Sequence, residues 1–287
     1  MLRGPSPPPT TTHDPRPTTH DPRPTTEETS MSHALFDLTG RIALVTGSSR
    51  GIGRAVATGL AEAGATVVLN GRNSERLSST AAELRSRVGA DRVRTSAFDV
   101  TDPSAVDEAV GAVESEIGPL DILVNNAGFQ HRQPMLELAP QDWDAVLRTD
   151  LTSAFLVGRS VASRMVARRR GKIVNICSVQ TALARPSIAP YAAAKAGLAG
   201  LTRAMCAEWA GYDIQVNGLA PGYVETELTA PLVADEAFTG WITGRTPAGR
   251  WGRIEDLVGP AVWLAGSGSD FVNGQVIFVD GGMTAVV

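Results

Sequence analysis

Three polar residues near the middle of the chain have types and spacing that suit proton transfer. Ser178 follows the apolar run 173–177, which has the β-branched composition of a buried strand. Tyr191 and Lys195 are four residues apart in an alanine-rich segment, so they lie one turn apart on one face of a predicted helix. An ammonium beside a phenol favours the phenolate, and such a phenol serves as a general acid and base. We therefore predict that Tyr191 transfers a proton while Ser178 holds the same substrate oxygen.

A Tyr and a Lys at this spacing also occur by chance in ordinary helices, so the elements around them matter. From residue 38 onward, strand-like segments alternate with helical ones. This alternation predicts an α/β fold, a Rossmann-type doubly wound parallel sheet of about seven strands with helices on both faces. Ligands of such sheets bind at the carboxyl ends of the strands, near the topological switch point. The expected strands are 42–46, 66–69, 93–98, 122–125, 173–177, 214–219 and 275–279, and the expected helices are 51–63, 74–88, 103–117, 140–168, one from 191 and pieces within 225–265.

The composition excludes several classes of function. The chain has 287 residues, 43% of them hydrophobic, which is enough for one large core. A net charge of −4 gives no basic surface for nucleic acid, and no apolar run is long enough to cross a membrane. Cys177 and Cys206 lack metal-ligand spacing, so we expect no metal site and assign Cys177 to the core. Free cysteines fit a reducing compartment, and the predicted location is cytoplasmic.

Residues 1–32 differ in composition from everything after them. TTHDPRP at 11–17 is repeated at 18–24, and Pro and Thr dominate the segment. Such a composition cannot bury a core, so we predict a disordered leader, followed by a single Rossmann-fold domain at 33–287. The leader lacks the apolar stretch of a secretory signal, and Met31 is a candidate start of the folded protein. A tail that binds a partner is the alternative interpretation of this segment.

A glycine-rich turn, TGSSRGIG at 46–53, lies between the first expected strand and the first expected helix. Its first glycine permits a tight turn, its second lets the backbone approach a pyrophosphate at the helix N-terminus, and its third allows close packing of helix and sheet. The spacing G-x-x-x-G-x-G differs from the common G-x-G-x-x-G, and a purely structural turn is the alternative. The predicted dinucleotide-binding residues of this turn are Gly47, Ser49, Arg50, Gly51, Ile52 and Gly53.

The ends of the next strands predict the cofactor's identity and its remaining contacts. An NAD site usually has an acidic residue after the second strand, whereas this chain has Asn70, Gly71 and Arg72 there. Arg72, together with Arg50, is suited to a 2′-phosphate, which predicts NADP(H), although both could be solvated surface arginines. The other predicted cofactor contacts are Asp99 and Val100 around the adenine and the turn 125–128 beside the nicotinamide ribose. Asp99 could equally cap the helix after it, but Asp102 before Pro103 fits that role better.

Together these motifs resemble the classical short-chain dehydrogenase/reductase family over about residues 36–287. The matching residues are TGSSRGIG, NNAG at 125–128, Ser178, YAAAK at 191–195 and PGYVET at 221–226. The resemblance implies that Ser178 orients the substrate oxygen, that Tyr191 donates or accepts the proton, and that Lys195 holds the nicotinamide ribose. It further implies a homotetramer and places Asn125, Ala127, Gly128, Pro221, Gly222, Val224 and Thr226 along the nicotinamide end of the cofactor.

One position departs from the family's pattern. The family usually has an Asn in the long helix before the fifth strand, where it steadies a water in the proton relay. The matching residue here is Asp150, which adds a negative charge near Lys195. We include Asp150 among the candidate catalytic residues on this basis. A non-catalytic NADPH-binding protein is the alternative that this departure raises, although the intact Ser178, Tyr191 and Lys195 argue against it.

The substrate is indicated by longer runs, among them VVLNGRN, GKIVNICSVQ and NGLAPGYVETE. They resemble the branch of the family that acts at carbon 5 of gluconate, which implies reversible, NADP⁺-dependent oxidation of D-gluconate to 5-dehydro-D-gluconate. A sugar acid needs a cation for its carboxylate and polar groups for its hydroxyls, so we predict substrate contacts by Arg132, Arg185 and Gln180, with His131 as a further candidate. We expect the segment 225–251 to form a mobile lid. The alternative is a 3-oxoacyl thioester reductase or another ketone reductase.

Overall fold

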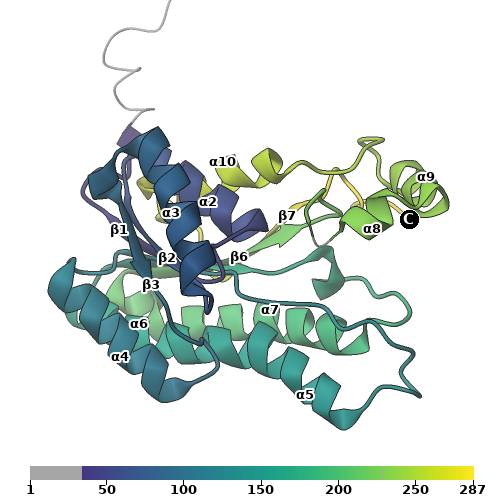
Figure 1. Cartoon of the computed structure of the whole chain (residues 1–287), viewed down its shortest axis with the longest axis horizontal. Coiled ribbons are helices and arrows are strands. Elements are labelled where there is room, and N and C mark those ends of the chain that lie inside the picture. Colours follow the sequence, from purple (N-terminus) through teal and green to yellow (C-terminus); the bar gives the residue numbers. More distant parts are fainter. Residues whose placement is uncertain (1–33, 228) are drawn as a thin grey trace, which may run out of the picture.

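The computed structural model describes residues 34–227 and 229–287, so the prediction of a disordered leader at 1–32 lies outside the described residues. One parallel sheet of seven strands runs through the molecule in the order β3-β2-β1-β4-β5-β6-β7 (Figure 1). This confirms the predicted doubly wound sheet, and strand order reverses between β1 and β4. The strands are β1 (Ile42–Val45), β2 (Thr66–Asn70), β3 (Val93–Ser96), β4 (Ile122–Asn125), β5 (Gly171–Ile176), β6 (Ile214–Pro221) and β7 (Val276–Val279).

Helices cover both faces of the sheet, as Figure 1 shows. Each face has its own core, because the strands alternate the direction of their apolar side chains. One face packs against α2 (Gly51–Glu62), α3 (Ser74–Val88) and α10 (Val258–Ala265). The other packs against α4 (Pro103–Glu116), α6 (Ser153–Arg168) and α7 (Ala189–Trp209), and α5 (Pro140–Leu147) lies against α7. Short 3₁₀ turns occupy Ala90–Arg92, Val179–Thr181, Ala210–Tyr212, Ile254–Leu257 and Ser267–Ser269.

The predicted single helix at 140–168 is interrupted. A π-helical turn at Arg148–Thr152 separates α5 from α6. Threonine and aspartate have low helix propensity, and the segment RTDLT is rich in both, which weakens the helix at this point. The Ser153 hydroxyl donates to the Thr149 carbonyl at 2.5 Å within the altered turn. Because a π turn adds one residue, it changes the direction of the side chains it carries, Asp150 among them.

Two smaller features position the site. Asp102 accepts hydrogen bonds from the amides of Ser104 and Ala105 and so caps α4, as predicted. The segment after β6 folds into α8 (Ala230–Val233) and α9 (Glu236–Arg245), which confirms the expected helical pieces there. The side chains of Ile242 and Trp251 are buried against Val179 and Met283. This segment therefore has a small apolar core of its own.

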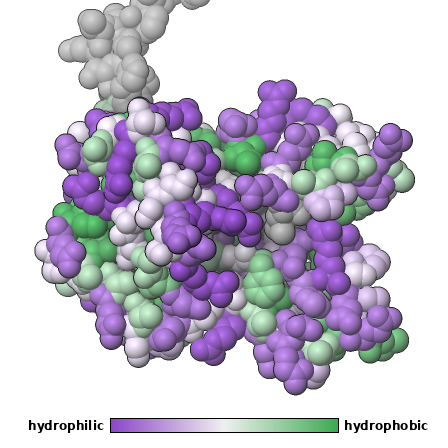
Figure 2. Space-filling view, viewed as in Figure 1, coloured by the Kyte–Doolittle hydropathy of each residue, from purple (hydrophilic) through white to green (hydrophobic). Residues whose placement is uncertain are grey.

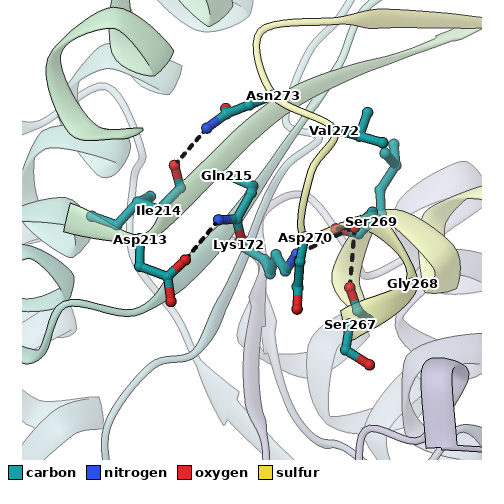
Figure 3. A network of polar contacts seen from close by, with 12 residues as sticks. Lys172, Asp213, Ile214, Gln215, Ser267, Gly268, Ser269, Asp270, Val272 and Asn273 are labelled. Carbon is teal, nitrogen blue, oxygen red and sulfur yellow. Dashed lines mark hydrogen bonds and ion pairs between the residues drawn. The ribbon is translucent and has the colours of Figure 1, made fainter. Parts of the chain in front are cut away.

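A polar network anchors the amino ends of β5 and β6, opposite the ends that carry the candidate site (Figure 3). The buried Lys172 Nζ donates to Asp270 Oδ1 at 2.7 Å and to Ser269 Oγ at 3.3 Å. Asn273 Nδ2 donates to the Ile214 carbonyl at 3.0 Å. These contacts fix the loop before β7 to strands β5 and β6. No helix within residues 34–227 and 229–287 has the length and apolar character needed to span a membrane.

Candidate active site

Two adjoining cavities lie at the carboxyl ends of the central strands. The first, of about 230 Å³, is lined by all four candidate catalytic residues and by the loop after β6. The second, of about 470 Å³, extends along the ends of β1 and β2. Gly47, Arg50, Asn126, Gly128 and Phe129 line both, so the cavities form one elongated groove. The face drawn in Figure 2 is hollowed between the region of α8 and that of α5.

The first cavity brings Ser178, Tyr191 and Lys195 together. Ser178 ends β5 and opens a 3₁₀ turn, where its Oγ accepts the Gln180 amide at 3.2 Å. Tyr191 and Lys195 lie in the first turns of α7, and Lys195 Nζ is 5.5 Å from the centroid of the Tyr191 ring. A hydroxyl, a phenol and an ammonium therefore face one space, which is the arrangement that proton exchange with a bound substrate requires.

Lys195 is held by the protein itself. Its Nζ donates to the Ile176 carbonyl at 2.9 Å and lies 3.5 Å from Asp150 Oδ2. Burial alone would lower the pKa of Lys195, but the charges of Asp150, Tyr191 and Cys177 outweigh it and raise that pKa. Lys195 therefore remains an ammonium throughout the physiological pH range. Burial raises the pKa of Cys177 to about 11, which fits its assignment to the core.

The glycine-rich turn has the backbone shape that a phosphate site needs. Gly47 has φ +61°, and a Cβ there would approach Ala127 Cα to 2.9 Å. Gly51 has φ +55° at the start of α2, with open space where a side chain would lie. Within residues 34–227 and 229–287 no side chain caps α2, so its first amides are available to bind an anion. The Asn70 side chain accepts the Gly47 amide at 3.2 Å and so holds the turn against β2.

Most of the predicted cofactor residues line the groove. Arg72 is 81% exposed, with Nη1 3.8 Å from Asp99 Oδ2, and Arg50 Nη1 is 3.5 Å from Glu227 Oε2. Such exposed pairs contribute little stability, so both guanidiniums remain available to a phosphate. Ser49, Arg50, Asn70, Arg72, Asp99, Val100, Ala127 and Gly128 line the second cavity, and Ile52, Pro221, Gly222, Val224 and Thr226 line the first.

Two of the predicted cofactor residues do not reach the groove wall. Gly53 packs against the Asn126 side chain, since a Cβ there would lie 2.3 Å from Asn126 Nδ2. Asn125 is buried within the sheet, and its Nδ2 donates to Asn175 Oδ1 at 2.9 Å. The next residue, Asn126, lines both cavities and donates to the carbonyls of Thr46 and Gly47.

The far end of the first cavity is cationic. Arg132 Nη2 donates to Gln130 Oε1 at 3.1 Å, and the Arg185 guanidinium lies 5.5 Å from the centroid of the Phe238 ring. Partial burial, and next the charge of Arg185, lower the pKa of Arg132. The acidic side chains of this cavity face other cations, since Asp150 is beside Lys195 and Glu227 is beside Arg50. Within the described part of the chain, neither Arg132 nor Arg185 forms an ion pair.

Gln180 lines the same cavity and has a buried acceptor oxygen. Its Nε2 donates to the Tyr223 hydroxyl at 3.4 Å, while its buried Oε1 has no partner among the described residues. Tyr223 in turn packs edge-on against Phe238, Trp241 and Trp251. His131 is outside the cavity wall and its Nε2 lies 3.1 Å from Gln133 Oε1.

The pattern of motifs and the geometry agree with comparison to known proteins. A model described as short chain dehydrogenase matches residues 41–237. The chain belongs to the short chain dehydrogenase family. It is 54% identical over 255 residues to a gluconate 5-dehydrogenase of Gluconobacter oxydans, which covers 88% of this chain and 99% of that protein. It is 48% identical over 259 residues to a 2-dehydro-3-deoxy-D-gluconate 5-dehydrogenase of Formosa agariphila, covering 90% and 97%.

The fold of this short chain dehydrogenase is also found in solved structures. The crystal structure of a gluconate 5-dehydrogenase from Burkholderia cenocepacia J2315 in complex with NADP and tartrate is 52% identical, with a TM-score of 0.86. The match covers 89% of this chain and all (100%) of that one. These similarities confirm the family predicted from the motifs.

The structure adds two residues of this short chain dehydrogenase that the sequence analysis did not single out. Asn126 was part of a motif, and strand alternation could have placed it opposite Asn125, facing the groove. Tyr223 was also inside a motif, but its hydroxyl contact depends on Gln180 from another loop. No local pattern indicates that contact.

Proposed function

We propose that this chain is an NADP(H)-dependent oxidoreductase that interconverts D-gluconate and 5-dehydro-D-gluconate. The observation that carries the proposal is a cavity in which Ser178, Tyr191 and Lys195 face the same space as two arginines that have no acidic partner among the described residues. A substrate with a carboxylate at one end and a secondary hydroxyl near the other matches that layout. The names of both curated relatives point to carbon 5 of gluconate or of a deoxy derivative.

The groove fits a dinucleotide with a 2′-phosphate. The uncapped start of α2 and the open space at Gly51 suit a pyrophosphate. At the end of β2, the Asn70 side chain is engaged with the Gly47 amide and the carbonyls of Ser96 and Phe98. It thus takes the place that an acidic ribose ligand would occupy, whereas Arg72 beside it suits a phosphate. When bound, NADP(H) supplies or accepts the hydride.

Side chains of this protein transfer the proton and orient the substrate oxygen. During alcohol oxidation, Tyr191 takes the proton from the substrate hydroxyl, and during ketone reduction it returns that proton to the same oxygen. Ser178 Oγ donates a hydrogen bond to this oxygen and so orients it. The Lys195 ammonium, fixed by the Ile176 carbonyl, favours the phenolate form that oxidation requires.

Substrate recognition is assigned to the cationic end of the cavity. Arg132 and Arg185 bind the carboxylate, and the free Gln180 Oε1 accepts a hydrogen bond from a sugar hydroxyl. The segment 225–251, which carries α8 and α9, acts as the lid. Neither Trp241 nor Trp251 lines the cavity, so both serve the packing of this lid.

The active form is a homotetramer in the cytoplasm. Edge strand β7 is only half buried, and Phe271 in the loop before it is fully exposed in the single chain. Apolar surface of this kind is suited to burial against further copies of the chain.

A substrate panel tests the proposed function. Purified protein is assayed with NADPH against 5-keto-D-gluconate and a 3-oxoacyl thioester, and with NADH in place of NADPH. We expect oxidation of NADPH with the sugar acid and little turnover with the thioester. A preference for the thioester would instead identify a 3-oxoacyl thioester reductase. Binding of NADPH without turnover of either compound would favour the non-catalytic alternative.

A further inference from the structure

A buried carboxyl group lies directly beside the ammonium of the catalytic centre. The Asp150 side chain is 0% exposed, and its Oδ2 is 3.5 Å from Lys195 Nζ. Asp150 Oδ1 accepts the Phe129 amide at 2.9 Å, while Oδ2 has no hydrogen-bond partner among the described residues. One oxygen is therefore used to fix the carboxyl group, and the other lies beside Lys195.

The backbone is built to place this carboxyl group. Asp150 is the middle residue of the π-helical turn between α5 and α6, and it lines the first cavity. The Phe129 amide reaches it from the loop after β4, and Gly128 in that loop lies against the carboxylate. Two segments distant in sequence thus hold Asp150 in one orientation. A carboxyl group without a defined role would not need to be fixed by both of these segments.

Lys195 has three N–H donors, and three groups of the protein lie near them. One donor goes to the Ile176 carbonyl at 2.9 Å, and the Asp150 carboxylate lies 3.5 Å from Nζ. The centroid of the Tyr191 ring is 5.5 Å from the same nitrogen. The ammonium is therefore close to both a carboxylate and a phenol.

We propose that Asp150 is a positioning residue that sets the pH range in which Tyr191 exchanges its proton. Its negative charge compensates Lys195 and so restrains formation of the Tyr191 phenolate. The proposal rests on the proton-transfer role of Tyr191 in the proposed function. It concerns residues that the comparisons leave unassigned.

The charged and titratable groups around Asp150 are few. Lys195 lies beside it from α7, and the Phe129 amide reaches it from the loop after β4. Tyr191 on α7 and Cys177 at the end of β5 act on Lys195. Burial raises the pKa of Asp150, with the charge of Lys195 and the Phe129 hydrogen bond acting in the opposite direction. When this carboxylate is ionised, it offsets the ammonium. When it is neutral, the ammonium acts on the phenol alone and favours the phenolate more strongly.

The test is an ultraviolet titration of tyrosinate in the full-length protein without substrate. The chain has three tyrosines, so a Tyr191→Phe reference removes the signals of Tyr212 and Tyr223 by subtraction. In Asp150→Asn, which keeps an acceptor for the Phe129 amide, we expect Tyr191 to ionise at a pH lower by about one unit. Asp144→Asn, a charge change on the exposed side of α5, should leave the titration unchanged.

The result of this titration does not depend on which substrate the protein uses, because no substrate is present. An unchanged Tyr191 titration in Asp150→Asn, or a shift to higher pH, overturns the proposal. Asp150→Ser is the second neutral variant and decides the question if Asp150→Asn does not fold by circular dichroism. With an active substrate in hand, the pH profile of alcohol oxidation should move in the same direction, and its half-maximum should fall by a similar amount. A uniform loss of rate at every pH would instead indicate a purely structural role.

Discussion

The two ends of the groove are lined by different kinds of groups. At the cofactor end the main contributors are backbone groups, namely the turn at Gly47 and Gly51 and the free amides of α2. At the substrate end they are side chains, and Arg132, Arg185 and Gln180 come from two separate loops. The binding free energy of a site made of backbone groups is shared among many contacts. The binding free energy of a site made of side chains depends on a few contacts. Single substitutions of residues that contact the substrate directly should therefore have larger effects than single substitutions at the cofactor end.

The largest expected effect is that of Tyr191→Phe. It removes the group that we propose exchanges a proton with the substrate, so turnover should fall by about a thousandfold. Binding of NADPH, measured by fluorescence titration, should change little, because the cofactor end is intact. Near-normal turnover of a folded Tyr191→Phe protein would contradict the proton-transfer role.

Arg132→Met should raise the KM for 5-keto-D-gluconate by about 10- to 100-fold, since a charge-assisted hydrogen bond contributes about 1.5–3 kcal/mol. The kcat should change less, because the reacting groups stay in place. Arg159→Met, on the exposed side of α6, is the matched control and should behave like the wild type. An equal loss with a neutral ketone substrate would show that Arg132 supports the fold of the loop and does not bind a carboxylate.

At the cofactor end, Arg72→Ala should weaken NADPH binding by about tenfold and leave NADH binding nearly unchanged. Only one exposed ionic contact to the 2′-phosphate is lost, while the backbone contacts remain. Arg76→Ala on the outer face of α3 serves as the control. If both cofactors lost affinity equally, Arg72 would contribute to the groove's shape and not to the recognition of a phosphate.

The smallest expected effect is that of Tyr223→Phe. The substitution keeps the aromatic packing against Phe238 and Trp251 but removes the acceptor of the Gln180 Nε2 hydrogen bond. Gln180 then loses one constraint, so the KM for the sugar acid should rise by about 2- to 10-fold with kcat nearly constant. A larger loss would mean that the Tyr223 hydroxyl itself contacts the substrate.

The same contrast explains what could be predicted from the sequence. The strands, most helices and the turn around Gly47 follow from local periodicity and from conformations that glycine alone adopts readily. The pairing of Tyr191 with Lys195 follows from helical spacing. The π turn around Asp150 could not be foreseen, because a one-residue change in hydrogen bonding leaves the apolar pattern almost unaltered. The contact of Tyr223 with Gln180 depends on tertiary packing between the loop after β5 and the loop after β6.

Strand β5 carries a consequence for the evolution of this molecule. Its amino end is tied to Asp270 through Lys172, while its carboxyl end supplies both the carbonyl that holds Lys195 and the residue Ser178. A shift of β5 by one residue relative to β4 would turn its side chains to the opposite faces of the sheet. The carbonyl that holds Lys195 and the Ser178 side chain would then both leave the proposed active site. The buried Lys172, which lies far from the proposed active site, thus helps to keep β5 in register. Selection for turnover should therefore also act on Lys172.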